Sequence, residues 1–356
     1  MKVLHLASAN RWTGAAAPAF AETAALREAG IDAHYAYVGG YKLGAKLARV
    51  DFAHPVIDKA QNPSAFRCSL GAIERLLLHH RFDIIHAHLT YDHWLARFAA
   101  RLVSGTHLAR TFHARRVLRS DPFTKSLINR SEALFVVNAT FRDAPALRHR
   151  APVFTPPPLD QQQFTPDGPN VRARYGIAPG APLLAAIGKL AAGRGFEDVL
   201  DTFAAVRRTL GSARLMIIGH GEHRPFLERH AANLGIAGAV VWAGYHEDDL
   251  AEHYRAANVL LFTAAGSDEG HRAVIEAMGC GVIPVTYPLP GMDALLGELA
   301  PRLIAAAGTS DSLALKVTEV LGGETAELQR RAYERSGEFG YERAARRLSD
   351  AYFAIF

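Results

Sequence analysis

Several patterns that identify common classes of protein are missing from this sequence. The 356 residues include only two cysteines, Cys68 and Cys280, and no Cys-x-x-Cys pair or Cys/His cluster. We therefore expect neither a disulfide framework nor a zinc site, and we expect a reducing, cytoplasmic compartment. No uncharged apolar run reaches the roughly 18 residues that a membrane span requires. Met1 and Lys2 lead directly into a short apolar stretch, which is too brief for a signal peptide.

The composition excludes fibrous and disordered classes of protein. Hydrophobic residues make up 49% of the chain and charged residues 21%, which is the balance of a globular protein. A chain of 356 residues exceeds the usual size of a single domain, so we expect two domains with separate cores.

Positive charge is concentrated in the first half of the chain. Residues 1–160 contain 21 Lys or Arg against 12 Asp or Glu, whereas residues 161–356 contain 19 against 23. This excess predicts an anionic partner for the first half. No nucleic-acid-binding motif accompanies the charge, so an anionic membrane surface or a phosphate-bearing lipid is favoured over nucleic acid, and a merely solvated basic face is about as compatible. The densest basic run comprises Arg97, Arg101, Arg110, Arg115, Arg116, Arg119, Lys125 and Arg130.

Short apolar strands alternate with helical segments along both halves of the chain. In the first half the expected strands read KVLHLAS, AHYAYV, FDIIHAH, LARTFH and ALFVVNA, and in the second half PLLAAIGKL, RLMIIGHG and VVWAGY. This alternation predicts an α/β fold with two doubly wound, Rossmann-like parallel sheets. Residues 41–65 have weaker periodicity and contain Pro55 and Pro63, so we expect a mobile flap there.

A proline-rich stretch separates the two halves. Residues 154–169 read FTPPPLDQQQFTPDGP, in which three consecutive prolines and a polar run favour a stiff, extended connection. We therefore expect a linker here, with the domain boundary after residue 160. An ordinary surface loop is the other interpretation of this stretch.

The stretch from Leu260 to Thr286 has the most informative order of residues. It reads LLFTAAGSDEGHRAVIEAMGCGVIPVT, which predicts a strand, a glycine break, a helix with Asp268 and Glu269 in its first turn, and a second strand. Ligands of parallel sheets bind where strands end and helices begin. Asp268 and Glu276 are therefore candidates to bind hydroxyl groups of a sugar or a ribose, although acids that simply complement a helix dipole show the same pattern.

The Asp-x7-Glu spacing followed by AMGCGVIPV resembles the acidic signature of the retaining GT-B glycosyltransferases of family four, also called glycosyl transferases group 1. In that family the first acid contacts the donor sugar and the second holds the ribose of the nucleotide sugar, which implies these roles for Asp268 and Glu276. Glu269 is one residue too close for the spacing, and with Gly270 and Arg272 it lies among the residues expected at the donor. Arg272 has two equally weighted roles, an ion pair with Asp268 or a contact with a phosphate or an acidic sugar.

Four further positions match the family pattern and complete the implied site. Gly14, after the first strand, corresponds to a glycine that lets the backbone approach the donor phosphate. His113 ends the strand LARTFH, where the family commonly places a histidine beside the donor sugar. Lys189 and Arg194 correspond to an Arg and Lys pair in exchanged order, and they would neutralise the departing diphosphate without a metal.

The resemblance implies a GT-B architecture of two Rossmann-like domains that face each other across a cleft. Residues 1–160 would form the acceptor-side domain, and residues 161–335 the domain that binds the nucleotide sugar. Residues 336–356 would form a helix that crosses back to the first domain. His86 and His88 also end a strand of the first domain, and one of them could face the acceptor.

The implied activity is transfer of a hexose-type sugar from a UDP- or GDP-sugar to a hydroxyl group, with retention of configuration. A lipid-linked or polysaccharide acceptor is expected, as in bacterial lipopolysaccharide, capsule or exopolysaccharide synthesis. The resemblance implies no cofactor and no metal. The protein is expected in the cytoplasm, including the inner face of the cytoplasmic membrane.

Three other functions stay open. A sugar-nucleotide epimerase of the same architecture would act on the donor without an acceptor. An oxidoreductase would need a dinucleotide-binding fingerprint after the first strand, and NRWTGAAAP is a poor one. A non-catalytic sugar-nucleotide-binding protein fits the substituted motif positions, and it predicts donor binding without turnover.

Overall fold

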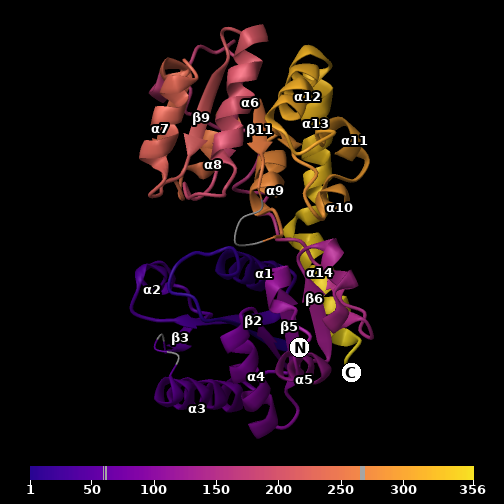
Figure 1. Ribbon diagram of the computed structural model, residues 1–356. Helices are drawn as coiled ribbons and strands as arrows, with labels where there is room; N and C mark the ends of the chain where they lie inside the picture. The colour runs from indigo at the N-terminus through magenta and orange to yellow at the C-terminus, as the bar shows by residue number, and fades with distance from the viewer. Residues whose placement is uncertain (59, 61, 265–268) are drawn as a thin grey trace. The chain divides into compact units, whose positions relative to one another are not determined.

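The computed structural model of the chain describes every residue except 59, 61 and 265–268. Two parallel β-sheets, one in each of two units, form its framework (Figure 1). Unit 1 comprises Met1–Pro158, Ser267–Gly270 and Phe339–Phe356. Unit 2 comprises Leu159–Gly266 and His271–Glu338.

Within the described residues, the sheet of unit 1 has seven parallel strands in the order β3-β2-β1-β4-β5-β6-β7. Their bounds are β1 Lys2–Ala7, β2 Asp32–Val38, β3 Ala53–Ile57, β4 Ile84–Ala87, β5 His107–Phe112, β6 Ala133–Val136 and β7 Val153–Phe154. Every residue of β4 and β6 is buried, as expected of strands that helices cover on both faces. The winding direction reverses between β1 and β4, and ligands of such sheets bind outside the carboxyl ends of the strands at this kind of switch point.

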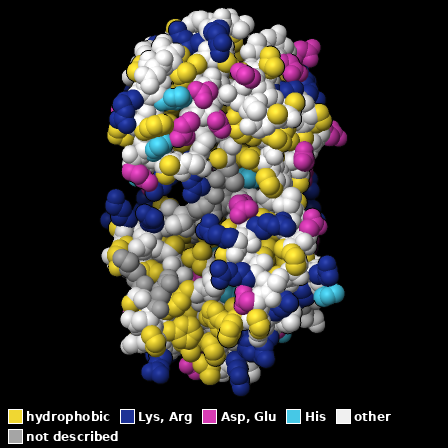
Figure 2. All heavy atoms as spheres, viewed as in Figure 1, with side chains coloured by type: hydrophobic (Ala, Val, Ile, Leu, Met, Phe, Trp, Pro, Cys, Tyr) yellow, Lys and Arg dark blue, Asp and Glu magenta, His cyan; other side chains and the backbone are white. Residues whose placement is uncertain are grey.

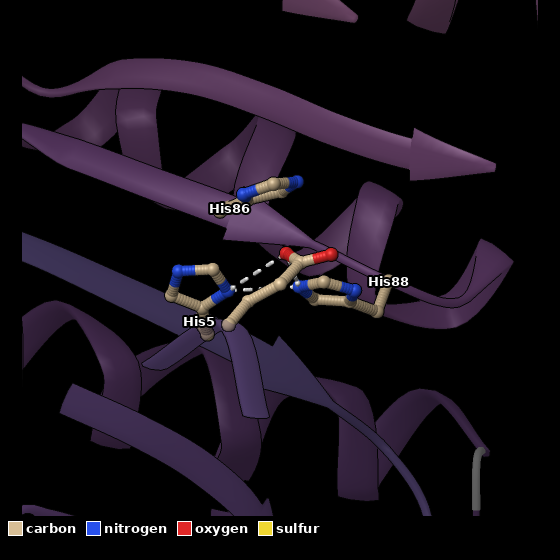
Figure 3. Close-up of side chains that lie close together, drawn as sticks. His5, His86 and His88 are labelled. Carbon is tan, nitrogen blue, oxygen red and sulfur yellow. Dashed lines mark hydrogen bonds and ion pairs between the residues drawn. The ribbon is translucent and has the colours of Figure 1, made fainter. Parts of the chain in front are cut away.

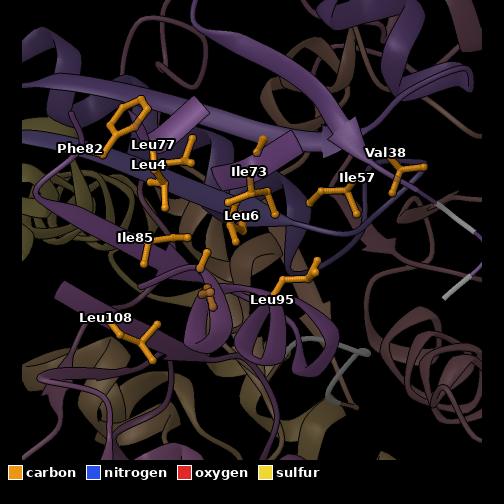
Figure 4. Close-up of a cluster of buried hydrophobic side chains, with 14 residues drawn as sticks. Leu4, Leu6, Val38, Ile57, Ile73, Leu77, Phe82, Ile85, Leu95 and Leu108 are labelled. Atoms are coloured by element: carbon orange, nitrogen blue, oxygen red, sulfur yellow. The ribbon is translucent and has the colours of Figure 1, made fainter. Parts of the chain in front are cut away.

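Helices cover both faces of this sheet. Their bounds are α1 Ala16–Glu28, α2 Lys42–Leu47, α3 Pro63–His80, α4 Thr90–Leu102, α5 Pro122–Asn129 and α14 Tyr341–Phe353. On one face Leu4 and Leu6 of β1 pack in one cluster with Ile73 of α3 and Leu95 of α4 (Figure 4). Because side chains alternate in direction along a strand, His5, which lies between these leucines, faces the other layer of helices.

The last helix, α14, belongs to unit 1 although the chain reaches it from unit 2 (Figure 1). It packs against α1, with Leu348 in the same hydrophobic cluster as Leu26 and Val3. The Tyr352 hydroxyl group lies 2.5 Å from Nδ1 of His86 on β4, and both side chains are fully buried. The expected return of the C-terminal helix to the first domain is confirmed.

Replacing Tyr352 with phenylalanine should destabilise unit 1. The change keeps the ring and removes the hydroxyl group from a buried hydrogen bond with His86. We expect the free energy of unfolding, measured by urea denaturation, to fall by about 1–3 kcal/mol. Phe353→Ala is the control, because Phe353 is 59% exposed and its loss should change stability by less than about 0.5 kcal/mol. Equal losses in both variants would contradict a specific role of the hydrogen bond.

Regular elements occupy much of the described part of residues 41–65, the segment expected to form a mobile flap. The segment contains α2 and β3, and α3 begins within it. Pro55 lies in β3, an edge strand, where its missing N–H group removes no hydrogen bond to a further strand. The end of β2 approaches β3 so closely that a Cβ on Gly39 would lie 2.8 Å from Cβ of Pro55. An edge position therefore tolerates a proline that the local pattern disfavours.

The described part of unit 2 forms a sheet of five parallel strands in the order β10-β9-β8-β11-β12. The strand bounds are β8 Leu183–Ile187, β9 Arg214–Ile218, β10 Val240–Gly244, β11 Val259–Phe262 and β12 Ile283–Thr286. The helix bounds are α6 Phe196–Thr209, α7 Arg224–Asn233, α8 Leu250–Ala256, α9 Arg272–Gly279, α10 Met292–Leu296, α11 Ala300–Leu303, α12 Ser310–Gly322 and α13 Thr325–Ser336. The winding direction reverses between β8 and β11. Among the described helices of both units, none is both long and apolar enough to cross a membrane.

The two units divide between Pro158 and Leu159, inside the proline-rich stretch. Leu159 and Phe164 are buried. A Cβ on Gly279, at the end of α9, would lie 2.9 Å from Cδ2 of Leu159, so this glycine permits the close packing. The second part of the proline-rich stretch is therefore held against α9 of unit 2.

Candidate functional site

Two loops pack together at the carboxyl end of the unit 2 sheet, next to the point between β8 and β11 where its winding reverses. The loop after β8 carries Lys189, and the loop after β9 lies directly against it. A Cβ on Gly219 would lie 1.9 Å from the carbonyl oxygen of Gly188. A Cβ on Gly221 would lie 2.0 Å from the carbonyl oxygen of Leu190. Both glycines are therefore required for this packing, which fixes the backbone on either side of Lys189.

Lys189 presents its ammonium group to solvent. The side chain is 61% exposed, and Nζ lies 3.3 Å from Oε1 of Glu222, whose side chain is 68% exposed. A pair this exposed contributes little to stability, so the ammonium group can exchange Glu222 for a stronger anionic ligand.

Arg194 lies in the same loop, at the start of α6. Gly193 and Gly195 flank it with φ of 73° and 72°, a conformation that residues with a side chain rarely adopt. The carbonyl oxygen of Gly195, the N-cap of α6, accepts a hydrogen bond of 2.8 Å from Oγ1 of Thr263, which follows β11. This bond joins the loops after β8 and β11. A helix N-terminus in a loop that carries two cations favours an anion such as a diphosphate.

Glu276 lies on α9 and is 6% exposed. Its Oε2 accepts a hydrogen bond of 3.1 Å from the Tyr254 hydroxyl group of α8, a partner that the sequence did not reveal. Its Oε1 lies 3.4 Å from Nε of Arg272, so Arg272 pairs with Glu276. Burial raises the pKa of the Glu276 carboxyl group, and the charge of Arg272 opposes this rise.

Helix α9 begins later than the sequence pattern predicts. It starts at Arg272, and its N-cap His271 has the left-handed φ of 55°. Glu269 therefore precedes the helix, and the expectation that it occupies the first helical turn is wrong. Asp268, expected to contact the donor sugar and to be one partner of Arg272, lies outside the described residues.

Glu269 and Gly270 belong to unit 1. The backbone N–H of Glu269 donates a hydrogen bond of 3.1 Å to the carbonyl oxygen of His113. Oε1 of Glu269 accepts a hydrogen bond of 3.0 Å from the backbone N–H of Arg115, and its carbonyl oxygen accepts one of 2.9 Å from Nδ2 of Asn138. The structure thus brings two of the expected site residues, Glu269 and His113, side by side.

His113 follows β5 and is 5% exposed. Its Nε2 lies 3.0 Å from Nδ1 of His88. Burial, with a smaller effect from the charge of Arg110, lowers the pKa of His113 to about 3. The ring is therefore neutral near pH 7, where it can form hydrogen bonds but is no cationic acid. This state is compatible with the hydrogen-bonding role expected for His113.

A cluster of buried polar side chains lies beside His113 in unit 1, and the sequence analysis missed it. His5 of β1 pairs in register with His86 of β4, and both rings lie on the same side of the sheet (Figure 3). His88, which follows β4, and Glu22, which lies on α1, complete the cluster. All four side chains are at most 1% exposed. Burial lowers the pKa of His5 to about 3 and the pKa values of His86 and His88 well below their usual range. The available signal was a histidine within each of two apolar strand segments.

Gly14 lies in the turn between β1 and α1, at the switch point of the unit 1 sheet. Oγ1 of the neighbouring Thr13 accepts a hydrogen bond of 3.1 Å from the backbone N–H of Ala16, the first residue of α1. Gly14 is therefore close to a helix N-terminus, and the approach of a donor phosphate to it stays a prediction.

The basic run of unit 1 contains both buried and exposed side chains. Arg110 is 2% exposed and donates a hydrogen bond of 2.6 Å to the carbonyl oxygen of Leu89, so it does not contribute to a basic surface as expected. Burial, followed by repulsion from Arg130 and Arg101, lowers the pKa of Arg97. Figure 2 shows Lys and Arg side chains around an apolar area of unit 1, over α3 and α4.

Comparison with known proteins places the second half of the chain in a family context. The profile of the family described as glycosyl transferases group 1 matches residues 167–339. The 2-deoxystreptamine glucosyltransferase of Streptomyces kanamyceticus is 27% identical over 181 residues, which are 49% of this chain and 46% of that protein. The GDP-mannose-dependent alpha-(1-6)-phosphatidylinositol monomannoside mannosyltransferase of Mycolicibacterium smegmatis is 30% identical over 205 residues, which are 52% of this chain and 51% of that protein. The chain spans about half the length of these relatives.

Solved structures resemble the chain along nearly its whole length. HepE of Anabaena, in complex with UDP, has a TM-score of 0.82 at 16% identity, covering 99% of this chain and 100% of that one. A glycosyltransferase from Rickettsia africae ESF-5 has a TM-score of 0.82 at 14% identity, covering 99% of this chain and 98% of that one. Similarity at such low identity shows the fold alone, and it confirms the GT-B fold expected from the sequence.

Proposed function

Residues 167–339 belong to the glycosyl transferases group 1 family, and from this premise we propose that the protein is a retaining glycosyltransferase. It moves a hexose-type sugar from a UDP- or GDP-sugar to a hydroxyl group of a lipid-linked or polysaccharide acceptor, as in bacterial lipopolysaccharide, capsule or exopolysaccharide synthesis. HepE, which shares the fold, was solved in complex with UDP, and one relative is named as a GDP-mannose-dependent mannosyltransferase, so both donor classes belong to the proposal.

The joined loops at the switch point of unit 2 carry this proposal. Lys189 is an exposed cation on a fixed backbone, and Arg194 stands at the N-terminus of α6. Cleavage of the bond between sugar and diphosphate places negative charge on the leaving group. Positioned cations stabilise that charge by about 3 kcal/mol per donor, so the proposal requires no metal at the diphosphate.

The remaining donor contacts follow from the two acids and His113. Glu276 of α9 binds the ribose hydroxyl groups through its carboxylate. The hydrogen bond from the Tyr254 hydroxyl group of α8 holds this carboxylate in place. Asp268 contacts the transferred sugar, and the neutral ring of His113 forms a hydrogen bond with a hydroxyl group at the reacting face.

Unit 1 supplies the acceptor side in this proposal. An open hollow of about 630 Å³ lies at the carboxyl ends of β2 and β3, with Tyr41, Asp58 and Ser69 in its lining. The backbone N–H of Asp58 donates a hydrogen bond of 2.8 Å to Oγ of Ser69. Hydroxyl and carboxylate groups in an open hollow provide the donors and acceptors that a sugar hydroxyl group requires.

Exposed apolar side chains accompany the basic ones on unit 1. Leu78, Phe98, Leu102 and Phe123 are between 42% and 71% exposed. Apolar and cationic side chains on one surface favour an anionic membrane. We therefore include peripheral association with the membrane, which would bring the enzyme to a lipid-linked acceptor.

The experiment that tests the donor assignment is a thermal-shift titration with UDP, GDP, ADP and their sugars, without added metal. A ligand at about 100 times its dissociation constant should stabilise the folded state by about 2.7 kcal/mol. We expect one of the two nucleotide families, UDP or GDP, to raise the melting temperature. Lys189→Ala is the matched control, and it should weaken the response to the diphosphates. A well-folded sample that responds to no nucleotide would contradict the proposal.

The products formed from the stabilising donor distinguish the proposed enzyme from the other functions. Transfer requires an acceptor, and extracts of bacterial glycolipids and polysaccharides provide the first panel. An altered nucleotide sugar formed without an acceptor would identify an epimerase. Donor binding without any turnover across the panel would identify a non-catalytic binding protein.

A further inference from the structure

The cluster beside His113 forms a second candidate site, one that the transfer reaction does not use. Nδ1 of His5 lies 2.9 Å from Nε2 of His88. Oε2 of Glu22 lies 3.8 Å from the first of these atoms and 3.7 Å from the second. Neither carboxylate oxygen of Glu22 has a hydrogen-bond partner among the described residues. A fully buried carboxylate without hydrogen bonds is costly unless another charge balances it.

The three separations match those of ligand atoms around one small cation. The three atoms, Nδ1 of His5, Nε2 of His88 and Oε2 of Glu22, form a triangle with sides of 2.9, 3.8 and 3.7 Å. The point at equal distance from all three atoms lies about 2.0 Å from each, which is the length of a metal–ligand bond. Zn–N bonds are about 2.0–2.1 Å long, and Zn–O bonds are about 2.0–2.2 Å long. Two imidazoles and a carboxylate are also the ligand types that zinc and related divalent transition metals take.

We propose that unit 1 binds one divalent transition-metal ion, of the zinc type, through Nδ1 of His5, Nε2 of His88 and one carboxylate oxygen of Glu22. His86 is the candidate for a fourth ligand, because one of its nitrogens lies within 4.8 Å of the ligand atoms of the other three. Both nitrogens of His86 are hydrogen bonded, one of them to Tyr352. His86 therefore becomes a ligand only by exchanging one of these bonds.

Full burial of the ligands indicates a structural ion. A catalytic metal keeps an open coordination position that water or substrate can reach, whereas a structural one is enclosed. The ligands come from β1, from the residue after β4 and from α1, so the ion joins α1 to the centre of the sheet. Such an ion is acquired during folding, and its binding free energy adds to the stability of the fold.

The ion would also determine the tautomer of two histidines. When Nε2 of His88 is bound to the metal, the ring proton of His88 must be on Nδ1, which lies 3.0 Å from Nε2 of His113. His88 then donates this hydrogen bond, and His113 carries its own proton on Nδ1. The effect on transfer rests on the proposed function, whereas metal binding does not.

A charge pair without a metal is the competing arrangement. The guanidinium group of Arg347, on α14, acts electrostatically on the Glu22 carboxylate and opposes the rise in pKa that burial causes. Arg347 would also repel a cation bound at Glu22. The two arrangements differ in one measurable quantity, the metal content of the folded chain.

The test uses the full-length chain. The chain is unfolded in the presence of a chelator and then refolded with and without zinc. Both samples are desalted, and their zinc content is measured by inductively coupled plasma mass spectrometry. We expect about one zinc ion per chain, and a higher melting temperature than that of the chain refolded without zinc. Cobalt(II) in place of zinc should give the visible absorption of a four-coordinate ion. Less than about a tenth of an equivalent of zinc, with no change in melting temperature, would overturn the proposal.

Single substitutions locate the ion. Glu22→Gln and His5→Gln should each lower the zinc content at least about tenfold. His34→Gln is the matched control, because it alters the separate group of His34, His54 and His80 and should leave the zinc content unchanged. Loss of zinc in the control alone would overturn the assignment to His5 and Glu22. Nucleotide binding by the same samples reports independently on the proposed function, because none of these residues lies in unit 2.

Discussion

Replacing Lys189 with alanine should lower the turnover number for sugar transfer by about 10²- to 10³-fold. The substitution removes an exposed cation from the loop after β8, and a group that stabilises charge in the transition state contributes about 3 kcal/mol. The fold should be unaffected, because the side chain is 61% exposed and its ion pair with Glu222 is also exposed. Initial rates of nucleotide release measure the turnover, and the melting temperature reports on the fold.

Glu222→Gln is the matched control for this substitution. It removes the partner of Lys189 and leaves the cation in place, so turnover should stay within about twofold of the unaltered enzyme. Arg194→Ala should resemble Lys189→Ala, with losses that are not additive because both cations act on one leaving group. A rise in the donor KM at unchanged kcat would assign Lys189 to ground-state binding. Turnover of Lys189→Ala close to that of the unaltered enzyme would contradict its assigned role.

The sheets were predictable because their strands are buried on both faces. A strand such as Ile84–Ala87 is read as a short apolar run bounded by polar residues, whatever its neighbours are. The return of α14 to unit 1 came from the family resemblance, and Leu348 of α14 indeed packs in the core of that unit. Pro55 shows the limit of local patterns, since it is tolerated only because β3 lies at the edge of the sheet.

The start of α9 was mispredicted because distant residues determine it. Glu269 has the helix-favouring position of an acid before an apolar run, but its backbone is hydrogen bonded to His113 and Asn138 of unit 1. His271 then adopts a left-handed conformation, and the helix begins only after it. Long-range hydrogen bonds thus outweigh a local helix signal, which is worth only tenths of a kcal/mol to about 1 kcal/mol per residue.

The cluster around Glu22 illustrates a site that no spacing rule could reveal. Its members are separated by up to 83 residues along the chain, the interval between His5 and His88, whose Nδ1 and Nε2 atoms lie 2.9 Å apart. They meet because β1 and β4 are neighbours in register and because α1 covers that face of the sheet. By contrast, Lys189 and Arg194 are close in sequence and follow one strand, so a motif could identify them together.

Lowering the pH from about 7.5 to about 5 should destabilise the folded protein by several kcal/mol. Burial lowers the pKa values of seven described imidazoles of unit 1, those of His5, His54, His80, His86, His88, His93 and His113. A histidine of the unfolded chain titrates at a pKa of about 6.5. Below that pH the unfolded chain binds protons that the native state does not bind, so stability falls as the pH falls from about 6.5 towards the folded pKa values. At pH 5 the loss is about 2 kcal/mol for each imidazole that stays neutral.

Buried carboxyl groups oppose this effect, among them Asp92 and Glu22 of unit 1 and Glu276 of unit 2. Burial raises the pKa of Asp92 to about 6 and that of Glu22 well above its usual range. The native state binds these protons more readily than the unfolded chain does, so acidification stabilises the fold through them. Among the described residues of both units, eight imidazoles with lowered pKa values act against four carboxyl groups with raised ones. The net effect of acidification is therefore a loss of stability.

Urea denaturation at both pH values, with a chelator present, measures this loss. His93→Gln is the informative variant, because His93 is buried, bonds to Oγ of Ser131 at 2.9 Å and lies outside the group proposed to bind metal. The substitution can change the free energy of unfolding at pH 7.5. It should nevertheless reduce the difference between the free energies of unfolding at the two pH values by about 2 kcal/mol. A denaturation midpoint that does not change with pH, or a pH dependence that is the same in the variant, would show that these histidines become protonated without unfolding the protein.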